Sequence, residues 1–315
     1  MGKYIVYFDS GTSNSRIYLL DKDFQVLYVD KKNVGSRNSS IEGSNRVLIE
    51  GLYELYTKLL QEKHLTEEDV TSIYMSGMIT SPYGMKEVPH LKVPLSVQEF
   101  ADSLYCHYED TLFHRNIYLV PGLKTVNDDF SFVGNMRGEE IEIIGTLDEL
   151  RSRGITHAAL MMPGSHTHVT YVKDDVVSDI ISNFTGELFY ALKKETIMAP
   201  ILGVEATADD LDPEMIHKAL ENLDRLGFNR SLYICHAMRI MESGTPLQRF
   251  SYGEGVVNGG VRKSLEYYCE HFWKGCDTLV IVSDEFMYCS PLFLKEVLIS
   301  KTLSGCRSLR QRAMP

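Results

Sequence analysis

Residues 9–16, DSGTSNSR, form a turn rich in glycine, serine and threonine between two apolar stretches. The stretches at 3–9 and 15–20 have the β-branched and aromatic content typical of strands, and a third strand is expected at 24–29. Polar turn residues separate the second strand from the third. Three neighbouring strands joined by tight turns predict an antiparallel meander at the start of the chain.

The same pattern returns 153 residues further along the chain. An apolar run at 157–162, a turn that begins at Pro163 and a strand at 169–172 repeat the order of the opening. At this offset Gly11 falls on Gly164, with no gap. So long a period indicates a duplicated domain rather than a solenoid, although a strand–glycine turn–strand pattern also arises by chance.

Strands and helices alternate in the rest of the chain. Further strands are expected at 72–75, 116–120 and 278–282, and helices at 44–61, 187–198, 213–226, 254–272 and 291–300. This alternation favours strands added in parallel to the same sheets. We therefore predict an α/β protein of two similar domains, residues 1–147 and 148–315, with a hinge near 145–154.

The composition narrows the class of protein. The 315 residues suffice for two domains, and 44% hydrophobic with 24% charged residues is normal for a packed globular protein. A net charge of -11 argues against a nucleic-acid partner. The six cysteines form no C-x-x-C pair, which is typical of reduced thiols in the cytoplasm. No leader and no membrane-spanning segment is visible, so we expect a cytoplasmic protein with no membrane partner.

The first turn offers the groups that bind phosphate. Gly11, Thr12, Ser13 and Asn14 present backbone N–H groups and hydroxyls, and no side chain obstructs the approach at Gly11. Asp9, at the end of the first strand, is well placed to hold Mg²⁺, directly or through water. An ordinary hairpin made of turn-favouring residues would have the same composition. The turn is not a P-loop, because the sequence contains no G-x-x-x-x-G-K-[ST].

A second turn of this kind, PGSHTH, occupies residues 163–168. Two phosphate turns on two domains would clamp one nucleotide tail from both sides, which would explain the duplication. His166 and His168 lie two residues apart, with no third ligand nearby in the sequence. We therefore interpret them as phosphate contacts or surface residues rather than as a metal site.

Two charged segments precede the expected hinge. Asp128, Asp129 and the run NMRGEE at 135–140 supply carboxylates and one arginine. Phosphoryl transfer to a hydroxyl needs a carboxylate to orient the attacking oxygen, and positive charge near the transferred group. Solvated helix starts have similar charge runs. The irregular loops at 75–81 and 89–94 lie at a strand end, where α/β proteins gather substrate groups.

Taken together, these segments resemble one family, the 2-dehydro-3-deoxygalactonokinases of the actin, hexokinase and Hsp70 superfamily. The matching pieces are DSGTSNSR, MSGMITSPYGMKEVPHLKVP, LVPGL, NMRGEEIEIIG, MMPGSHTHV and NFTGEL, in family order over residues 4–190. The resemblance implies two ribonuclease-H-like (actin-like ATPase) domains with a nucleotide cleft between them. It also implies ATP and Mg²⁺ as cofactors, and phosphorylation of the 6-hydroxyl of 2-dehydro-3-deoxy-D-galactonate in galactonate and galactose catabolism.

The resemblance assigns roles residue by residue. It implies cofactor contacts at both turns, namely Gly11, Thr12, Ser13, Asn14 and Arg16 in the first and Pro163, Gly164, Ser165, His166 and His168 in the second. It implies a substrate side at Gly77, Met78, Ser81, Pro89 and Pro94. The candidate catalytic residues are Asp9, Asp129, Arg137 and Glu139, and Asp9 is also the candidate metal ligand. The catalytic base stays open among the three carboxylates.

The chain departs from the family pattern in three places. His168 and Glu142 stand where the family usually has lysine and glutamine. Residues 279–284, LVIVSD, lack the glycine turn that the superfamily lays against adenosine, and a side chain there would crowd a nucleoside. Two alternatives therefore stay open: a non-catalytic relative that senses a sugar acid, or a kinase for a different sugar acid. The sequence leaves the oligomeric state open, a homo-oligomer included.

Overall fold

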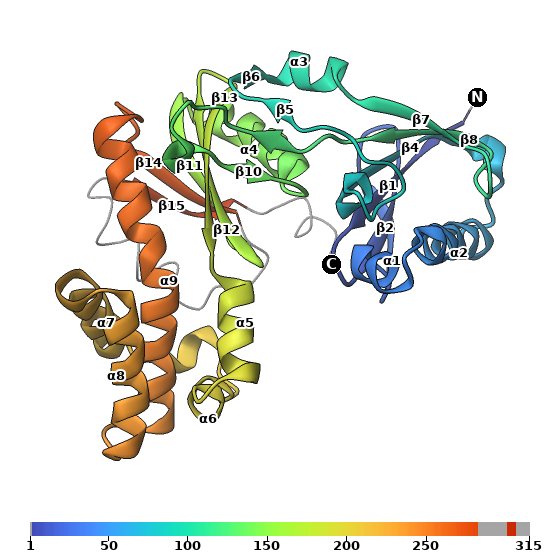
Figure 1. Cartoon of the computed structure of the whole chain (residues 1–315). Coiled ribbons are helices and arrows are strands. Elements are labelled where there is room, and N and C mark those ends of the chain that lie inside the picture. Colours follow the sequence, from blue (N-terminus) through green and yellow to red (C-terminus); the bar gives the residue numbers. More distant parts are fainter. Residues whose placement is uncertain (1, 283–300, 307–315) are drawn as a thin grey trace. The chain divides into compact units, whose positions relative to one another are not determined.

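The computed structural model describes residues 2–282 and 301–306 (Figure 1). These residues divide into two compact units, the first made of 2–148 with 175–177, and the second made of 149–174, 178–282 and 301–306. The region of the expected hinge is largely helical, because it lies within α4 (Glu140–Ser152). The domain limits 1–147 and 148–315 stay a prediction.

A six-stranded sheet forms the frame of the first unit. Its strands are β1 (Tyr4–Ser10), β2 (Ser15–Leu20), β3 (Val26–Lys32), β4 (Val70–Gly77), β7 (Tyr105–Glu109) and β8 (Arg115–Leu119). Their order is β3-β2-β1-β4-β8-β7. The predicted meander is confirmed as β1–β3, β4 and β8 add in parallel, and β7 closes the edge antiparallel to β8.

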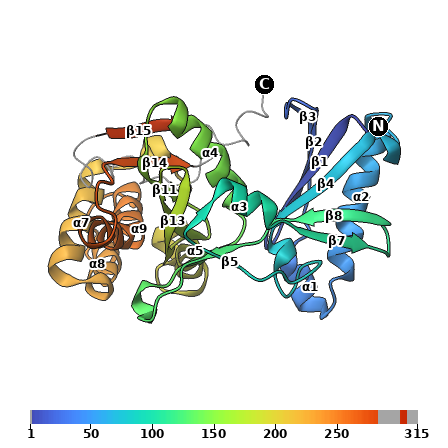
Figure 2. The ribbon, with the colours of Figure 1, turned by 90° about the horizontal axis from the view of Figure 1, so that it is seen from above.

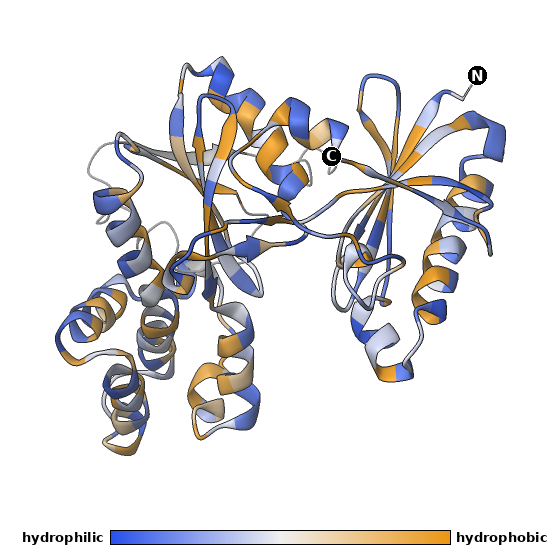
Figure 3. Cartoon of the chain, turned by 45° about the horizontal axis from the view of Figure 1, so that its top comes forward, coloured by the Kyte–Doolittle hydropathy of each residue, from blue (hydrophilic) through white to orange (hydrophobic). Residues whose placement is uncertain are grey.

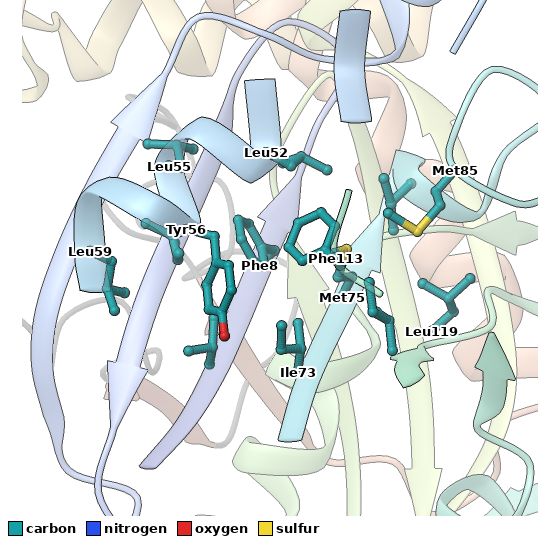
Figure 4. Packing of buried hydrophobic residues seen from close by; sticks show 14 of the residues in the cluster. Phe8, Leu52, Leu55, Tyr56, Leu59, Ile73, Met75, Met85, Phe113 and Leu119 are labelled. Atoms are coloured by element: carbon teal, nitrogen blue, oxygen red, sulfur yellow. The ribbon is translucent and has the colours of Figure 1, made fainter. Parts of the chain in front are cut away.

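One face of this sheet buries the core of the first unit against α2 (Arg46–Glu62). Along β1 the side chains of Val6 and Phe8 are buried on this face, because successive residues of a strand point to opposite sides. Figure 4 shows Phe8 beside Phe113, whose rings meet edge to face at 6.4 Å. The buried residues of α2 recur every three to four positions, as in Leu48, Leu52 and Leu55, which confirms the helix predicted at 44–61. Figure 3 shows hydrophobic and hydrophilic residues mixed along this helix.

Smaller elements complete the first unit. A three-stranded sheet has the order β10-β9-β5, with β5 (Leu91–Lys92), β9 (Leu123–Lys124) and β10 (Asn135–Met136). The remaining elements are α1 (Ser36–Glu42), α3 (Val97–Asp102), β6 (Leu95–Ser96) and the 3₁₀ turns η1 (Glu67–Asp69), η2 (Met78–Thr80) and η3 (Phe130–Phe132). The strand β6 pairs with Val176 and Val177.

The sheet of the second unit repeats the strand order of the first. Its strands are β11 (His157–Met162), β12 (His166–Lys173), β13 (Val176–Phe184), β14 (Thr278–Val282) and β15 (Lys301–Cys306). They run in the order β15-β14-β11-β12-β13, with β12 antiparallel to β11 and β14 parallel to it. Figure 2 shows β15 beside β14, with which it pairs in parallel. In both units the three strands of the meander lie in the order third, second, first. Two further strands, which run parallel to the first strand, follow in the sheet. This repeat confirms the predicted fold class of two ribonuclease-H-like domains.

Helices make up most of the rest of the second unit. They are α5 (Gly186–Glu195), α6 (Ala199–Leu202), η4 (Ala208–Asp210), α7 (Pro213–Leu226), α8 (Phe228–Ile240) and α9 (Pro246–His271). The start of α7 is fixed by Asp212, whose carboxylate accepts the N–H groups of Glu214 and Met215. The helices predicted at 187–198, 213–226 and 254–272 are confirmed as α5, α7 and the greater part of α9. The helix predicted at 291–300 lies outside the described residues.

Within the described ranges 2–282 and 301–306, no helix is long and apolar enough to cross a membrane.

Candidate functional site

The first turn links β1 and β2 and leaves its donors exposed. Gly11 N–H donates to the carbonyl of Asn14 at 2.8 Å, which closes the turn. Within the part of the chain that the structure describes, the N–H groups of Thr12, Ser13 and Asn14 donate to no acceptor, and these three residues are exposed. Three free, neighbouring N–H groups form the kind of concave donor set that binds phosphate oxygens.

Asp9 stands at the end of β1, on the sheet face opposite to the core. It pairs in register with Arg16 of β2, and Arg16 Nη1 lies 3.5 Å from Asp9 Oδ2. The Asp9 side chain is only 14% exposed, whereas that of Arg16 is 41% exposed. The pair therefore holds the carboxylate in place and leaves the guanidinium accessible beside the turn.

A cavity of about 390 Å³ in the first unit adjoins Asp9. Its walls are mostly apolar and aromatic, with Tyr7, Tyr18 and Tyr74 on the sheet side and Glu142 of α4 also on the wall. Asp9 thus lies between an apolar cavity and an exposed turn. Charges beside apolar walls interact more strongly with bound cations than charges in open water do.

Two glycines bring the RGEE segment to the first turn. Gly77, the last residue of β4, pairs with Ser10, and a Cβ at Gly77 would lie 2.4 Å from the Ser10 carbonyl oxygen. A Cβ at Gly138 would lie 3.6 Å from the Cα of Gly77. The structure therefore brings together the first turn, the end of β4 and the start of the RGEE segment.

Arg137 ties the loops on the substrate side together. Its guanidinium donates to the hydroxyl of Thr80, to the carbonyl of Val88 at 3.1 Å and towards Nδ1 of His90 at 3.2 Å. These three partners lie 47 to 57 residues away in the sequence. The observed contacts make Arg137 a positioning residue for residues 80–90. Its predicted catalytic role stays a prediction.

Glu140 is a buried carboxylic acid beside this network, and sequence reasoning gave it no separate role. Its side chain is 1% exposed, and Oε2 accepts the N–H of Gly138 at 2.8 Å. Burial raises the pKa of the Glu140 carboxyl to about 8, and the neighbouring charge of Glu139 adds to the rise. The acid is therefore largely neutral at neutral pH, and it holds Gly138 against Gly77.

Replacing Glu140 with glutamine is expected to flatten the pH dependence of stability. The pKa of the Glu140 carboxyl is about 8 in the folded protein and 4.5 in its ordinary, unfolded environment. The protonated acid therefore stabilises the fold fully below pH 4.5, and this stabilisation is lost by about pH 8. Wild-type unfolding free energy should then fall with rising pH in this window, by up to about 1.4 kcal/mol per pH unit. Urea unfolding at several pH values measures this. Glu68→Gln, at an exposed site, should keep the wild-type slope, and an equal slope in Glu140→Gln would refute the assignment.

The residues predicted on the substrate side differ in accessibility. Pro89 and Pro94 are exposed and Met78 is partly exposed. Ser81 is buried, and its hydroxyl donates to the carbonyl of Met78 at 2.7 Å. Ser81 therefore stabilises the 3₁₀ turn η2, and its contact with substrate stays a prediction.

Asp129 lies in the exposed loop between β9 and β10. Its Oδ1 accepts the N–H of Ser131 at 2.9 Å and so caps η3. This hydrogen bond holds the pKa of the Asp129 carboxyl below its ordinary value. No contact in the described residues links Asp129 to the first turn. Its proposed role as a base is therefore less supported than that of Asp9.

The second turn, between β11 and β12, has the same character as the first. Gly164 and Ser165 are exposed, and in the described chain their N–H groups donate to no acceptor. Pro163 has no N–H group to offer. The ring of His166 lies tilted against the ring of Phe184, with centroids 5.3 Å apart, and His166 Nε2 lies 3.2 Å from Glu187 Oε2. His166 is thus held at the edge of the turn.

His168 is buried next to this turn rather than exposed on it. Its Nδ1 lies 3.0 Å from the hydroxyl of Ser182. Burial lowers the pKa of His168 to about 4, and the charge of His166 contributes. The ring is therefore neutral at neutral pH and contributes to packing. Its predicted contact with the nucleotide stays a prediction.

Both turns are backed by the start of a helix. Arg37 N–H donates to the Thr12 carbonyl at 2.9 Å, and Glu187 N–H donates to the Ser165 carbonyl at 2.8 Å. A Cβ at Gly35 would lie 2.4 Å from the Thr12 oxygen, and a Cβ at Gly186 would lie 2.3 Å from the Gly164 oxygen. The repeat thus extends from the strands to the helices that support each turn. Sequence reasoning missed this pair of glycines, although each follows the third strand of its meander.

The Asp9 carboxylate and the N–H groups of the first turn together fit a magnesium ion that is bound with phosphate. Magnesium is usually held by one or two carboxylates together with substrate phosphates and water. Asp9 supplies one carboxylate beside the free N–H groups. Among the described residues, no group of three or more His, Cys, Asp or Glu side chains could hold a metal ion alone. The assignment of Mg²⁺ to Asp9 therefore stays a prediction.

The late segment without glycine is described only in part. Residues 279–282 belong to β14, and Ser283 and Asp284 lie outside the described residues.

Comparisons with known proteins agree with this fold. A curated Rhizobium meliloti (strain 1021) protein, named as a probable 2-dehydro-3-deoxygalactonokinase, is 26% identical over 199 residues. The match spans 62% of this chain but only 58% of that relative. A crystal structure of a Sinorhizobium meliloti protein assigned to the 2-dehydro-3-deoxygalactonokinases has a TM-score of 0.78 and 19% identity, over 98% of this chain and 95% of that chain.

The strand order and the paired turns place the chain in the structural class of actin-like ATPases and sugar kinases. Within that class, it belongs to the 2-keto-3-deoxy-galactonokinase family, whose model matches residues 9–288.

Proposed function

We propose that the protein is an ATP-dependent kinase that phosphorylates the 6-hydroxyl of 2-dehydro-3-deoxy-D-galactonate. The observation that carries the proposal is the pair of turns whose N–H groups donate to no acceptor among the described residues, at equivalent positions of two repeated units. Free backbone donors of this kind bind phosphate without a basic side chain, which suits a chain of net charge -11. Family membership supports the same activity.

The proposal gives each turn a role in binding ATP. We assign the phosphates to the N–H groups of Thr12, Ser13 and Asn14 in one turn, and of Gly164 and Ser165 in the other. The accessible guanidinium of Arg16 adds positive charge at the first turn. Mg²⁺ would bind beside Asp9 and neutralise charge on the transferred phosphoryl group.

In the proposed reaction the 6-hydroxyl oxygen forms a bond to the γ-phosphorus, and the bond from that phosphorus to the bridging oxygen of ADP breaks. The hydroxyl proton passes to a carboxylate, for which Asp9 is the first candidate because it lies beside the turn. Arg137 and Glu140 hold residues 80–90 and Gly138 in position. The phosphorylated sugar acid and ADP are the products.

We also propose that the protein acts in the cytoplasm on small molecules. Four cysteines in the described part of the chain, Cys106, Cys235, Cys269 and Cys276, are free thiols.

Purified protein with ATP, Mg²⁺ and 2-dehydro-3-deoxygalactonate is expected to form ADP and the 6-phosphorylated acid in equal amounts. Coupled ADP detection and mass spectrometry of the product measure this. A reaction without acceptor corrects for ATP hydrolysis, and related aldonic acids test the choice of acceptor. Absence of product with every acid would remove the proposal, and turnover of another acid alone would correct the substrate.

A further inference from the structure

The three-stranded sheet of the first unit has one basic face. Lys92 of β5 and Lys124 of β9 are direct neighbours in register, and Asn135 of β10 is the partner of Lys124 on the other side. Partners in register project to the same side of a sheet. The adjacent residues Leu123 and Met136 are buried, so they take the opposite face.

Two more polar side chains extend this face. His90 precedes Lys92 by two residues and Arg137 follows Asn135 by two, so both lie just outside the short strands β5 and β10. Arg137 Nη2 lies 3.2 Å from His90 Nδ1, so these two flanking residues contact each other. Burial lowers the pKa of His90 to about 4, and the positive charges of Arg137 and then Lys124 add to the effect. The ring is therefore neutral, and the cations are Lys92, Lys124 and Arg137.

These cations have no carboxylate partner in the part of the chain that the structure describes. No ion pair among the described residues is formed by Lys92, Lys124 or Arg137. Of the two acids near Arg137, Glu140 is largely protonated at neutral pH, which leaves Glu87 as the nearby negative charge. Like charges directly opposite each other destabilise a sheet. Three cations without an ion-pair partner among residues 2–282 and 301–306, in a chain of net charge -11, indicate a site for an anion.

The basic face is connected to the first turn through Gly138 and Gly77. Arg137 is followed by Gly138, which packs on Gly77 beside Ser10. From Asn135 to Gly138 is three residues, or about 10 Å of extended chain. A sugar acid carries its carboxylate at one end and the hydroxyl to be phosphorylated at the other. A sugar acid whose carboxylate binds to the basic face could therefore reach towards the turn with its far hydroxyl.

We propose that Lys92 and Lys124 bind the carboxylate of the sugar acid, with Arg137 and His90 as positioning residues behind them. The proposal rests on the kinase function above and deepens it, because it says how an acid is selected over a neutral sugar. Two ammonium groups opposite each other can both donate to one carboxylate. Their mutual repulsion is then relieved by the ligand.

Binding of the acid alone tests the proposal without turnover. Calorimetric titration with 2-dehydro-3-deoxygalactonate, in the absence of ATP, is expected to show a Kd raised about tenfold in Lys92→Met and in Lys124→Met, and further in the double variant. The Kd for ATP should stay unchanged in all three. The control is Lys31→Met, an exposed lysine on β3 of the same unit, which removes the same charge. Thermal melting shows that the variants remain folded.

Each outcome decides the matter. A Kd for the acid within twofold of wild type in the double variant would overturn the subsite. A raised Kd for ATP alone would overturn it too, and would give the face to nucleotide phosphates. No binding of the acid by wild type also overturns it. If the acid binds as expected but no phosphorylated product forms, the subsite stands and the kinase function fails.

Discussion

Changing Asp9 to asparagine is expected to lower kcat about a thousandfold, within the range that a positioned acid–base group contributes. Asparagine is isosteric but cannot accept the proton of the hydroxyl, and it binds Mg²⁺ less strongly than a carboxylate does. Asp9 is mostly covered and contacts Arg16, so the fold should tolerate the amide. Steady-state kinetics at saturating ATP measure the effect, and urea unfolding checks stability.

Parallel variants make the Asp9 result decisive. Asp129→Asn and Glu139→Gln alter the other two candidate bases, and Asp110→Asn changes an exposed aspartate of the same unit. The geometry predicts a small effect for Asp129, because its carboxylate caps η3 in an exposed loop. A loss in Glu139→Gln with near-normal activity in Asp9→Asn would move the role of base to Glu139.

Replacing Gly77 with alanine is expected to cost about 3 kcal/mol of stability and to reduce kcat/KM about a hundredfold. Gly77 has φ +87° and ψ -147°, a region that residues with a Cβ avoid. The new methyl group would lie 2.4 Å from the Ser10 carbonyl oxygen, so the chain must shift at the first turn. Urea unfolding and kinetics report the two effects separately.

Gly43→Ala is the matched control for Gly77. Gly43 caps the C-terminal end of α1 with φ +67°, and no heavy atom of the described residues lies within 4 Å of the position of a Cβ. Alanine there bears only the conformational cost of positive φ, about 1 kcal/mol, and activity should be unchanged. Equal losses in the two variants would show that the contact with Ser10 is unimportant.

The sequence predicts the strands that carry the turns well, and short or exposed strands poorly. The strands β2, β11 and β14 and the helix α7 have the expected limits, because long apolar runs or a clear cap mark them. By contrast, β7 is mostly exposed and polar. The strands β5, β9 and β10 have two residues each, too few for any period to appear. These strands can be identified only from their hydrogen-bonded pairing in the structure.

The candidate site divides in the same way. Both turns follow from glycine and hydroxyl residues placed between strands, which is a local signal. The links from Arg137 to Thr80, Val88 and His90 join distant parts of the sequence, and no local pattern contains them. The sequence predicted an accessible histidine at His168, but this side chain is buried in the structure. The neutral acid Glu140 depends on burial in the same way.

The three short strands β5, β9 and β10 all come from the first half of the chain, in segments separate from both phosphate-type turns. Under the proposed assignments, nucleotide binding and acceptor choice are therefore encoded in different stretches of the gene. If these assignments are right, substitutions in β5, β9 and β10 should change the acceptor and leave phosphate binding at the two turns unchanged. We therefore expect that a change of acceptor acid requires substitutions only in this one small sheet.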